Sequence, residues 1–390
     1  MKTQVAFDLS GLAWQYSTGV QNLYWAFVDA YANQPKFHQD FDLIFYDRSG
    51  IFNKKIHEKI GESYISSAPN WWPNRLRRPM QFLIATTNLF NPKIKNRINH
   101  VWNWGIFNPI ECSGSITIPD VIPLEYPQWF DKRFIRLTEK SLRFAEDNAN
   151  YIFTISHDVK DRVVKMSGIS ENRIEVIYPG IDTSYFKQVN VESVALTLRK
   201  YGLNAGGYLL SSGFLDPRKN LVRQLKAFEI ALSRGLKGVK YAITGLRTSL
   251  SDEVIKIIES PAIRSNVVFL GYVPKSQLIE LTSQAAAVMY CSIAEGFGLP
   301  IIEAMAVGAP VITSKNTSMQ ELGTSRAILV DPYDVDSIAF AIQDLVSQGY
   351  DDKIACIMNN KSFASKFTIE NWLGGHLDAY MGKPSNGRWL

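Results

Sequence analysis

The sequence predicts an α/β protein made of two doubly wound parallel sheets. Two observations carry this prediction. The chain has 390 residues, more than one hydrophobic core usually serves, so two domains are expected. Short apolar runs also alternate with segments long enough for one helix each. With 46% hydrophobic and 20% charged residues, the chain should be globular and ordered.

The C-terminal half shows this alternation most clearly. The expected strands are Tyr208 to Ser212, Val239 to Thr244, Val267 to Leu270, Ala287 to Tyr290, Val311 to Thr313 and Ile328 to Val330. Residues 221–236 form the best amphipathic helix pattern, with apolar side chains at helical spacing. The turn before that helix, 217–220, should lie at the carboxyl ends of the strands, where open α/β sheets bind ligands.

The N-terminal half alternates less regularly. Its expected strands are 4–8, 42–46, 116–118 and 151–156, and its expected helices are 20–31, 131–148 and 158–166. Residues 183–205 are polar and weakly patterned, which places the domain hinge there. The predicted domains are 1–185 and 206–366, followed by a segment, 367–390, whose residues 367–381 should be helical.

The stretch from Glu295 to Glu303 carries the chemistry. An apolar strand precedes it, and Pro300 suits the first turn of a helix. Gly296 and Gly298 let the backbone approach a ligand, while the helix N-terminus can receive anionic or hydroxyl oxygens. Two carboxylates accept hydrogen bonds from vicinal hydroxyls but would repel a bare phosphate, which favours a nucleotide diphosphate sugar over ATP. The alternative is that each acid merely charges a helix N-terminus.

Residues 295–303 resemble the Glu-x7-Glu signature of the retaining glycosyltransferases of family 4, which have the GT-B fold. The resemblance extends to 208–221, including the Pro-Arg-Lys-Asn turn of one subgroup, and to 268–273, 151–156 and 174–182. It implies two Rossmann-like domains facing a central cleft, with a C-terminal helix that crosses back to the N-terminal, acceptor-binding domain. The C-terminal domain would bind the nucleotide sugar.

The resemblance also implies roles for single residues. Lys219 would contact the donor phosphates, and Arg218 would add charge as the diphosphate leaves. Glu295 would hold sugar hydroxyls and Glu303 the ribose diol. The other implied donor contacts are the backbone N–H groups of Phe297, Gly298 and Leu299, the nucleobase border at Tyr272 and Val273, and Gly19 in the turn after the first strand. The transfer would follow front-face retaining chemistry without a protein nucleophile.

The chain departs from the family pattern at two places. Phe214 stands where many members have an arginine, so Arg218 is a candidate to take over its charge. Pro119-Asp120 replaces the family's His-Asp, so Asp120 is the candidate to orient the sugar or the acceptor, with a simple turn residue as the alternative. His157 could face the same cleft, although a cap or surface position is the commoner role.

No metal and no cofactor are expected. Asp334 and Asp336 have the Asp-x-Asp spacing of a metal site, but they open a predicted helix and fit capping better. The three cysteines, Cys112, Cys291 and Cys356, are far apart and fit reduced, buried thiols. There is no run of eighteen apolar residues and no secretion signal pattern, so a cytoplasmic protein is expected.

Residues 63–110 contain no acidic residue and interleave basic residues with tryptophans. Trp71, Trp72, Arg75, Arg77 and Arg78 suit the interface of an anionic membrane, which predicts peripheral attachment to the inner face of the cytoplasmic membrane. A nucleic-acid surface has similar ingredients, but no binding motif supports one. An ordinary insertion with buried aromatics is the other alternative.

The sequence bears on three functions. The leading one is a glycosyltransferase, expected to be a hexosyl- or mannosyltransferase, that uses a nucleotide sugar and a lipid-linked glycan acceptor in bacterial surface polysaccharide, lipopolysaccharide or O-antigen synthesis. The Pro-Arg-Lys-Asn subgroup suggests GDP-mannose as the donor. A nicotinamide oxidoreductase fits poorly, because Gly-x-Gly-x-x-Gly is missing after the first strand. A non-catalytic sugar-nucleotide or membrane-binding relative is the alternative, and donor turnover distinguishes it.

Overall fold

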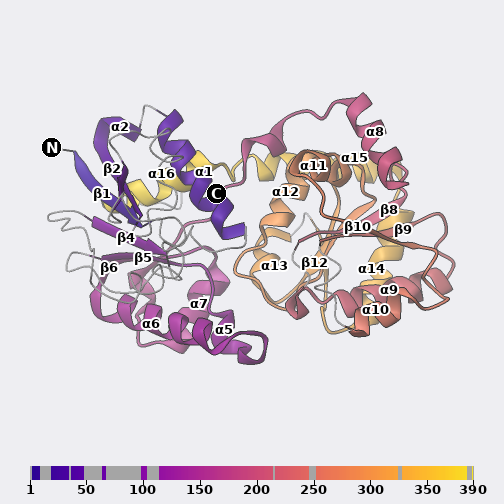
Figure 1. The fold of residues 1–390 in the computed structure, drawn as a ribbon, viewed down its shortest axis with the longest axis horizontal. Helices are drawn as coiled ribbons and strands as arrows, with labels where there is room; N and C mark the ends of the chain where they lie inside the picture. Colours follow the sequence, from indigo (N-terminus) through magenta and orange to yellow (C-terminus); the bar gives the residue numbers. More distant parts are fainter. Residues whose placement is uncertain are drawn as a thin grey trace, which may run out of the picture. The chain divides into compact units, whose positions relative to one another are not determined.

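The computed structural model describes residues 2–8, 19–34, 37–47, 64–66, 98–102, 114–213, 216–245, 252–323, 327–383 and 389. The chain forms two compact units. The first comprises residues 1–182 and 368–390, and the second comprises residues 183–367. Each unit is an α/β layer structure around one parallel sheet, as the apolar alternation predicted (Figure 1).

The strands described in the first unit form one parallel sheet in the order β3-β2-β1-β4-β5-β6-β7. They are β1 (Thr3–Asp8), β2 (Phe41–Asp47), β3 (Tyr64–Ser66), β4 (Ile98–Trp102), β5 (Gly114–Ile118), β6 (Ala149–Thr154) and β7 (Ile174–Val176). The register pairs Ala6 with Ile44 and Ile116 with Ile152, all apolar and buried. The sequence had not predicted β3, β4 or β7.

The helices of this unit lie between and beyond these strands. They are α1 (Gly19–Asn33), α2 (Phe37–Asp40), α5 (Ile122–Glu125), α6 (Lys132–Asn148), α7 (His157–Met166) and α16 (Ile369–Tyr380), with short 3-10 turns η4 (Pro127–Trp129) and η5 (Glu171–Arg173). The C-terminal helix α16 returns to the first unit and lies beside α1 (Figure 1). Fully buried Trp372 packs edge-on against Phe27, with ring centroids 4.8 Å apart.

A buried polar chain also ties α16 to the sheet. Nδ1 of His376 lies 3.0 Å from the carbonyl oxygen of Trp372 and must donate to it, so Nε2 of the neutral ring accepts from Thr117 at 3.2 Å. The Thr117 hydroxyl in turn accepts from Nε2 of His100 at 3.2 Å. Both imidazoles are fully buried, and this burial lowers the pKa of His376 to about 4 and that of His100 well below its usual range.

The second nitrogen of His100 completes the network. Nδ1 lies 2.9 Å from both the Ser115 hydroxyl and the Tyr380 hydroxyl, and it accepts from this pair. The two hydroxyls are themselves 2.9 Å apart. The last turn of α16 is therefore joined to β4 and β5 by hydrogen bonds as well as by apolar packing.

In the second unit the described strands form a parallel sheet in the order β10-β9-β8-β11-β12-β13. They are β8 (Tyr208–Ser211), β9 (Lys240–Thr244), β10 (Val267–Gly271), β11 (Ala287–Tyr290), β12 (Val311–Ser314) and β13 (Ile328–Val330). The helices are α8 (Val191–Tyr201), α9 (Leu221–Ser233), α10 (Asp252–Ile258), α11 (Lys275–Gln284), α12 (Leu299–Val307), α13 (Ser318–Gly323), α14 (Val335–Ser347) and α15 (Tyr350–Ala364), with 3-10 turns η6 (Thr183–Phe186) and η7 (Pro217–Lys219). α9 and α14 pack against each other beside the sheet (Figure 1).

The stretch 183–205, expected to be a weakly patterned hinge, contains the helix α8. Its packing against α11 mixes polar contacts with the apolar side chains Leu198 and Tyr201, and this mixture hid the helix from an apolar pattern. Ser193 and Thr197 each donate to the carboxylate of Glu280 at 2.5 Å, and Asn190 caps the helix. Two apolar side chains of α8, Val191 and Leu196, are exposed.

No helix among the described residues is both long enough and apolar enough to span a bilayer.

Candidate functional site

The site lies at the carboxyl ends of β8 and β11, which are neighbours in the second sheet. The turn η7 follows β8, and residues 291–298 follow β11 and lead into α12. Since parallel strands end at the same edge, these two segments meet there. The backbone N–H of Ile293 donates to the carbonyl oxygen of Arg218 at 2.7 Å, which fixes one segment against the other.

The turn η7 is built by its polar side chains. Asp216 caps it by accepting from the backbone N–H of Arg218 at 3.0 Å. Asn220 ends it in the left-handed region, with φ of 60°, a conformation that asparagine tolerates. Its buried amide donates to the carbonyl oxygens of Cys291 at 3.0 Å and Pro332 at 2.6 Å. Asn220 thereby holds the basic turn in register with the loop after β11.

The loop before α12 depends on Gly298. Its φ of 109° lies in the region that side chains disfavour, and an added Cβ would stand 2.9 Å from Cδ1 of Ile301. Pro300 occupies the first turn of α12, as the sequence predicted. The hydroxyl of Ser318 donates to the backbone carbonyl of Glu295 at 2.9 Å. These contacts fix where the Glu295 side chain leaves the loop.

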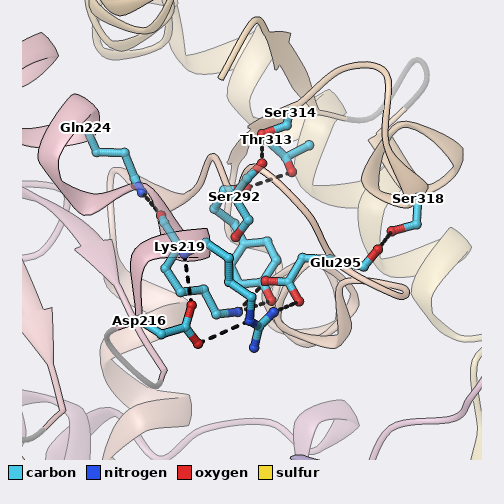
Figure 2. A network of polar contacts seen from close by, with 10 residues as sticks. Asp216, Lys219, Gln224, Ser292, Glu295, Thr313, Ser314 and Ser318 are labelled. Carbon is cyan, nitrogen blue, oxygen red and sulfur yellow. Dashed lines mark hydrogen bonds and ion pairs between the residues drawn. The ribbon is translucent and has the colours of Figure 1, made fainter. Parts of the chain in front are cut away.

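Four charged side chains converge at this edge, and Figure 2 labels three of them, Asp216, Lys219 and Glu295. Glu295 accepts from Arg218 through Oε2 and from Lys219 through Oε1, the latter at 2.6 Å. Arg218 also pairs through Nε with Asp216 at 3.1 Å. Glu295 is 7% exposed, so this is a buried acid shared by two cations.

The electrostatics follow from burial and these pairs. Burial alone would raise the pKa of Glu295, but Lys219 and Arg218 outweigh it and hold the pKa at about 2. Burial, with Arg218 nearby, lowers the pKa of Lys219, and Glu295 opposes this shift. Burial raises the pKa of Asp216 against the opposing influence of Arg218 and Lys219. A cluster of perturbed groups of this kind is typical of functional sites.

The other predicted donor residues of this unit lie on the loop, on α12 and after β10. Phe297 is buried, Leu299 begins α12, and Glu303 lies half-buried on the same helix. After β10, the side chain of Tyr272 is 79% exposed whereas Val273 is buried. The structure therefore brings Arg218, Lys219 and Glu295 into direct contact. The roles of the other donor residues stay predictions.

Three residues singled out from the sequence lie in the described part of the first unit. Gly19 is the first residue of α1. Asp120 follows β5, is half-buried, and accepts from the backbone N–H of Ile122 at 3.2 Å, a turn-type contact. His157 begins α7 and is exposed. Trp71, Trp72, Arg75, Arg77 and Arg78 lie outside the described residues, as does Phe214.

Asp334 caps α14, as predicted, by accepting from the backbone N–H groups of Asp336 and Ser337 at 2.9 and 3.2 Å. Asp336 pairs with Arg234 at 2.6 Å. Within the part of the chain that the structure describes, no three His, Cys, Asp or Glu side chains are grouped as metal ligands. Cys291 is a buried free thiol, and burial raises its pKa.

Sequence reasoning did not assign two members of the site, Asp216 and Tyr290. Nζ of Lys219 donates to the Tyr290 hydroxyl at 2.6 Å and lies 4.3 Å from the centre of its ring. Tyr290 ends an apolar strand and looked like core. Asp216 lies within 208–221, the stretch that resembles the family, and its position before Pro217 was the signal for a capping role.

The fold of two parallel sheets covered by helices is of the GT-B type. Residues 199–362 match the family model described as "Glycosyl transferases group 1", and residues 116–185 match "Glycosyltransferase Family 4". These two matches and the fold together support a GT-B glycosyltransferase of the family 4 type.

Among curated proteins, the chain is 29% identical to O-antigen chain mannosyltransferase B of Escherichia coli over 313 residues, which cover 78% of this chain and 81% of that protein. It is 29% identical to O-antigen chain mannosyltransferase RfbU of Salmonella typhimurium over 238 residues, covering 61% and 62% of the two proteins. Among solved structures, Anabaena HepE in complex with UDP and glucose has a TM-score of 0.69 at 16% identity and covers 97% of this chain and 100% of that one. WaaG, a glycosyltransferase involved in lipopolysaccharide biosynthesis, has a TM-score of 0.69 at 14% identity with the same coverage. These two likenesses establish the fold.

Proposed function

We propose that the protein is a retaining glycosyltransferase that moves a hexose from a nucleotide diphosphate donor to a glycan acceptor in bacterial O-antigen synthesis. The relatives named as O-antigen mannosyltransferases favour mannose, and with it GDP-mannose, as the sugar and the donor. The solved complex of HepE with UDP and glucose is a second support for a nucleotide-linked donor. A lipid-linked glycan is the proposed acceptor.

The observation that carries the proposal is the pairing of Glu295 with Arg218 and Lys219 directly before α12. Two cations held at the N-terminal side of a helix form a diphosphate site. The single carboxylate of Glu295 offsets part of the charge of both cations, and Asp216 also pairs with Arg218. When a diphosphate pairs with Arg218, Oε2 of Glu295 becomes available to accept hydrogen bonds from the sugar hydroxyls, while Oε1 keeps its bond to Lys219.

In the proposed reaction the bond between the sugar C1 and the phosphate oxygen breaks, and its electron pair goes to the diphosphate. The acceptor oxygen forms the new bond to C1 on the same face, and its proton passes to the departing phosphate oxygen. Arg218 and Lys219 stabilise the charge that develops on the leaving group. No step needs a metal or a protein nucleophile.

The remaining donor and acceptor contacts are proposed on the residues named from the sequence. Glu303 holds the ribose diol, and Tyr272 and Val273 border the base. Asp120 orients the sugar or the acceptor in place of the family histidine, whose position holds Pro119. Asp120 supports this role by its place, since it follows β5 directly and its carboxylate is half-buried.

A donor panel tests the proposal. Thermal unfolding is followed with GDP-mannose, UDP-glucose and other nucleotide sugars, and the true donor raises the transition by mass action. Lys219→Ala and Glu303→Ala should abolish that protection, while Lys226→Ala, which removes an exposed lysine paired with Glu253, should keep it. Equal protection in all three variants would refute the assigned contacts. Binding without sugar transfer would favour the non-catalytic alternative.

We also propose peripheral attachment to an anionic membrane, and α6 supports it. Five exposed cations, Lys132, Arg133, Arg136, Lys140 and Arg143, lie on α6 with one acid, Glu139, among them, whereas the exposed acids Glu146 and Asp147 lie in its last turn. Two of these cations stand in the first turn, where the helix dipole disfavours positive charge. Stacked Tyr126 and Trp129, with ring centroids 4.4 Å apart, lie directly before the helix. Cations beside aromatic rings suit a phospholipid headgroup layer.

Vesicle sedimentation tests this attachment. Anionic vesicles should sediment the protein at low salt, and zwitterionic vesicles should not. Arg136→Glu combined with Lys140→Glu should weaken sedimentation several-fold, and Lys237→Glu combined with Lys256→Glu, a matched change at exposed lysines of the second unit, should not. Absence of binding to anionic vesicles at low salt would eliminate the proposal.

A further inference from the structure

Tyr290 makes two different contacts with one ammonium group. Its hydroxyl accepts from Nζ of Lys219 at 2.6 Å, and its ring lies 4.3 Å from the same nitrogen. Tyr290 is 4% exposed, so both contacts are shielded from water. A lysine has four rotatable carbons and no preferred direction for its charge, and such paired contacts fix that direction.

Tyr290 is itself rigidly placed. It is the last residue of β11, which lies between β8 and β12 in the sheet. Its backbone carbonyl accepts from the hydroxyl of Thr313 at 3.0 Å, and Thr313 is also its register partner on β12. A side chain on a central strand holds a ligand-binding group more accurately than one on a loop.

The hydrogen-bonding capacity of Lys219 indicates what this placement serves. An ammonium has three N–H groups. Among the described residues, Tyr290 and Glu295 accept two of them, which leaves the third to a ligand. With two directions fixed, tetrahedral geometry fixes the third.

We propose that Tyr290 is a positioning residue that aims the third N–H of Lys219 at the diphosphate of the donor. The inference rests on the proposed function and adds the residue that orients its main cation. Negative charge on the leaving diphosphate grows in the transition state, so an ammonium that points away from it loses more transition-state stabilisation than donor binding in the ground state. The phenol also favours the charged form of Lys219, since it accepts from that form. Burial raises the pKa of Tyr290 well above its usual range, so the phenol stays protonated.

The test compares Tyr290→Phe with Tyr208→Phe. The first variant keeps the ring over Lys219 and removes only the hydroxyl. The second removes an equally buried hydroxyl, bonded to the carbonyl of Leu281, from the neighbouring strand β8. Tyr290→Phe should lower kcat about tenfold with KM changed less than about threefold. The alkaline limb of its kcat profile should move to lower pH, because the charged lysine has lost an acceptor. Tyr208→Phe should change neither quantity.

A second readout is independent of sugar transfer. Titration of Lys219 by NMR, without donor, should give a lower pKa in Tyr290→Phe than in the parent and in Tyr208→Phe. Unchanged kcat, pH profile and Lys219 titration in Tyr290→Phe would overturn the inference, as would losses equal to those of Tyr208→Phe. If the parent protein transfers no sugar from any donor, the proposed function fails, and the NMR comparison alone decides whether Tyr290 directs Lys219.

Discussion

The buried acid Glu295 gives the sharpest prediction. Its pKa of about 2 compares with an ordinary value of 4.5, and each pH unit is worth about 1.4 kcal/mol, so its charged form stabilises the fold by about 3 kcal/mol. Glu295→Gln should lower the free energy of unfolding by about this amount at pH 7, since it leaves Lys219 without a carboxylate partner and Arg218 with Asp216 alone. The sign follows from a lowered pKa. The stabilisation is present above pH 4.5 and is lost as the pH falls toward 2, so the difference between the two proteins should shrink to about 1 kcal/mol at pH 3.

The assay is urea unfolding at pH 7 and pH 3 with two probes. All nine tryptophans lie in residues 1–182 and 368–390, so their fluorescence reports on the first unit, whereas far-UV circular dichroism reports on both. Glu295→Gln should weaken the transition seen only by circular dichroism. Glu253→Gln, which breaks an exposed pair with Lys226, is the control and should have little effect.

Unfolding in the presence of pyrophosphate provides a further test. Inorganic pyrophosphate should raise the unfolding midpoint of Glu295→Gln more than that of the parent, because the carboxylate of Glu295 no longer competes for Arg218 and Lys219. A stability difference below about 1 kcal/mol at pH 7, or one that is the same at pH 3, would refute the reasoning about this acid.

Three further predictions follow. Burial holds the pKa of His376 at about 4 against an ordinary 6.5, so the native first unit binds fewer protons than the unfolded chain, and its free energy of unfolding should fall by about 3 kcal/mol between pH 6.5 and pH 4. Unfolding followed by tryptophan fluorescence measures this dependence on pH. His376→Leu should weaken the dependence, and an unchanged dependence in this variant would contradict the account. Gly298→Ala should destabilise the second unit by about 1–3 kcal/mol and weaken its protection by the donor. Gly202 also has positive φ but faces open space, so Gly202→Ala should cost only the backbone strain, and an equal loss of stability in the two variants would argue against the contact with Ile301. Asp336→Asn and treatment with EDTA should both leave sugar transfer unchanged, and restoration of lost activity by a divalent cation would disprove a metal-free reaction.

The sequence predicted the elements whose signal is local and apolar. β11 and β13 begin and end where their apolar runs do, and α9 starts at the predicted Leu221. β4 was missed because Asn99 and His100 interrupt its apolar residues, and the buried ring of His100 is tolerated there only because hydroxyls from β5 and α16 satisfy it.

The candidate site was predictable to a similar degree and for the same reason. The Glu-x7-Glu and Pro-Arg-Lys-Asn stretches are local signals, and they identified Glu295, Arg218 and Lys219. Their mutual pairing is a tertiary contact between segments more than seventy residues apart, which no spacing in the sequence encodes. The role of Tyr290 could not be predicted for a different reason. The sequence pattern of an apolar strand does not show whether the hydroxyl of its tyrosine bonds to a lysine or to a backbone carbonyl.

The return of α16 to the first unit has a consequence for synthesis on the ribosome. Residues 183–367 are contiguous and contain every strand described in their own sheet, so that unit can close while the chain is still growing. Residues 1–182 are synthesised first, but their unit cannot be completed until α16 leaves the ribosome. Until then Phe27, Ser115 and His100 lack their partners on this helix. Translation that stops before this helix would release a product with an open apolar groove and stranded polar groups, a form that chaperones retain and proteases remove.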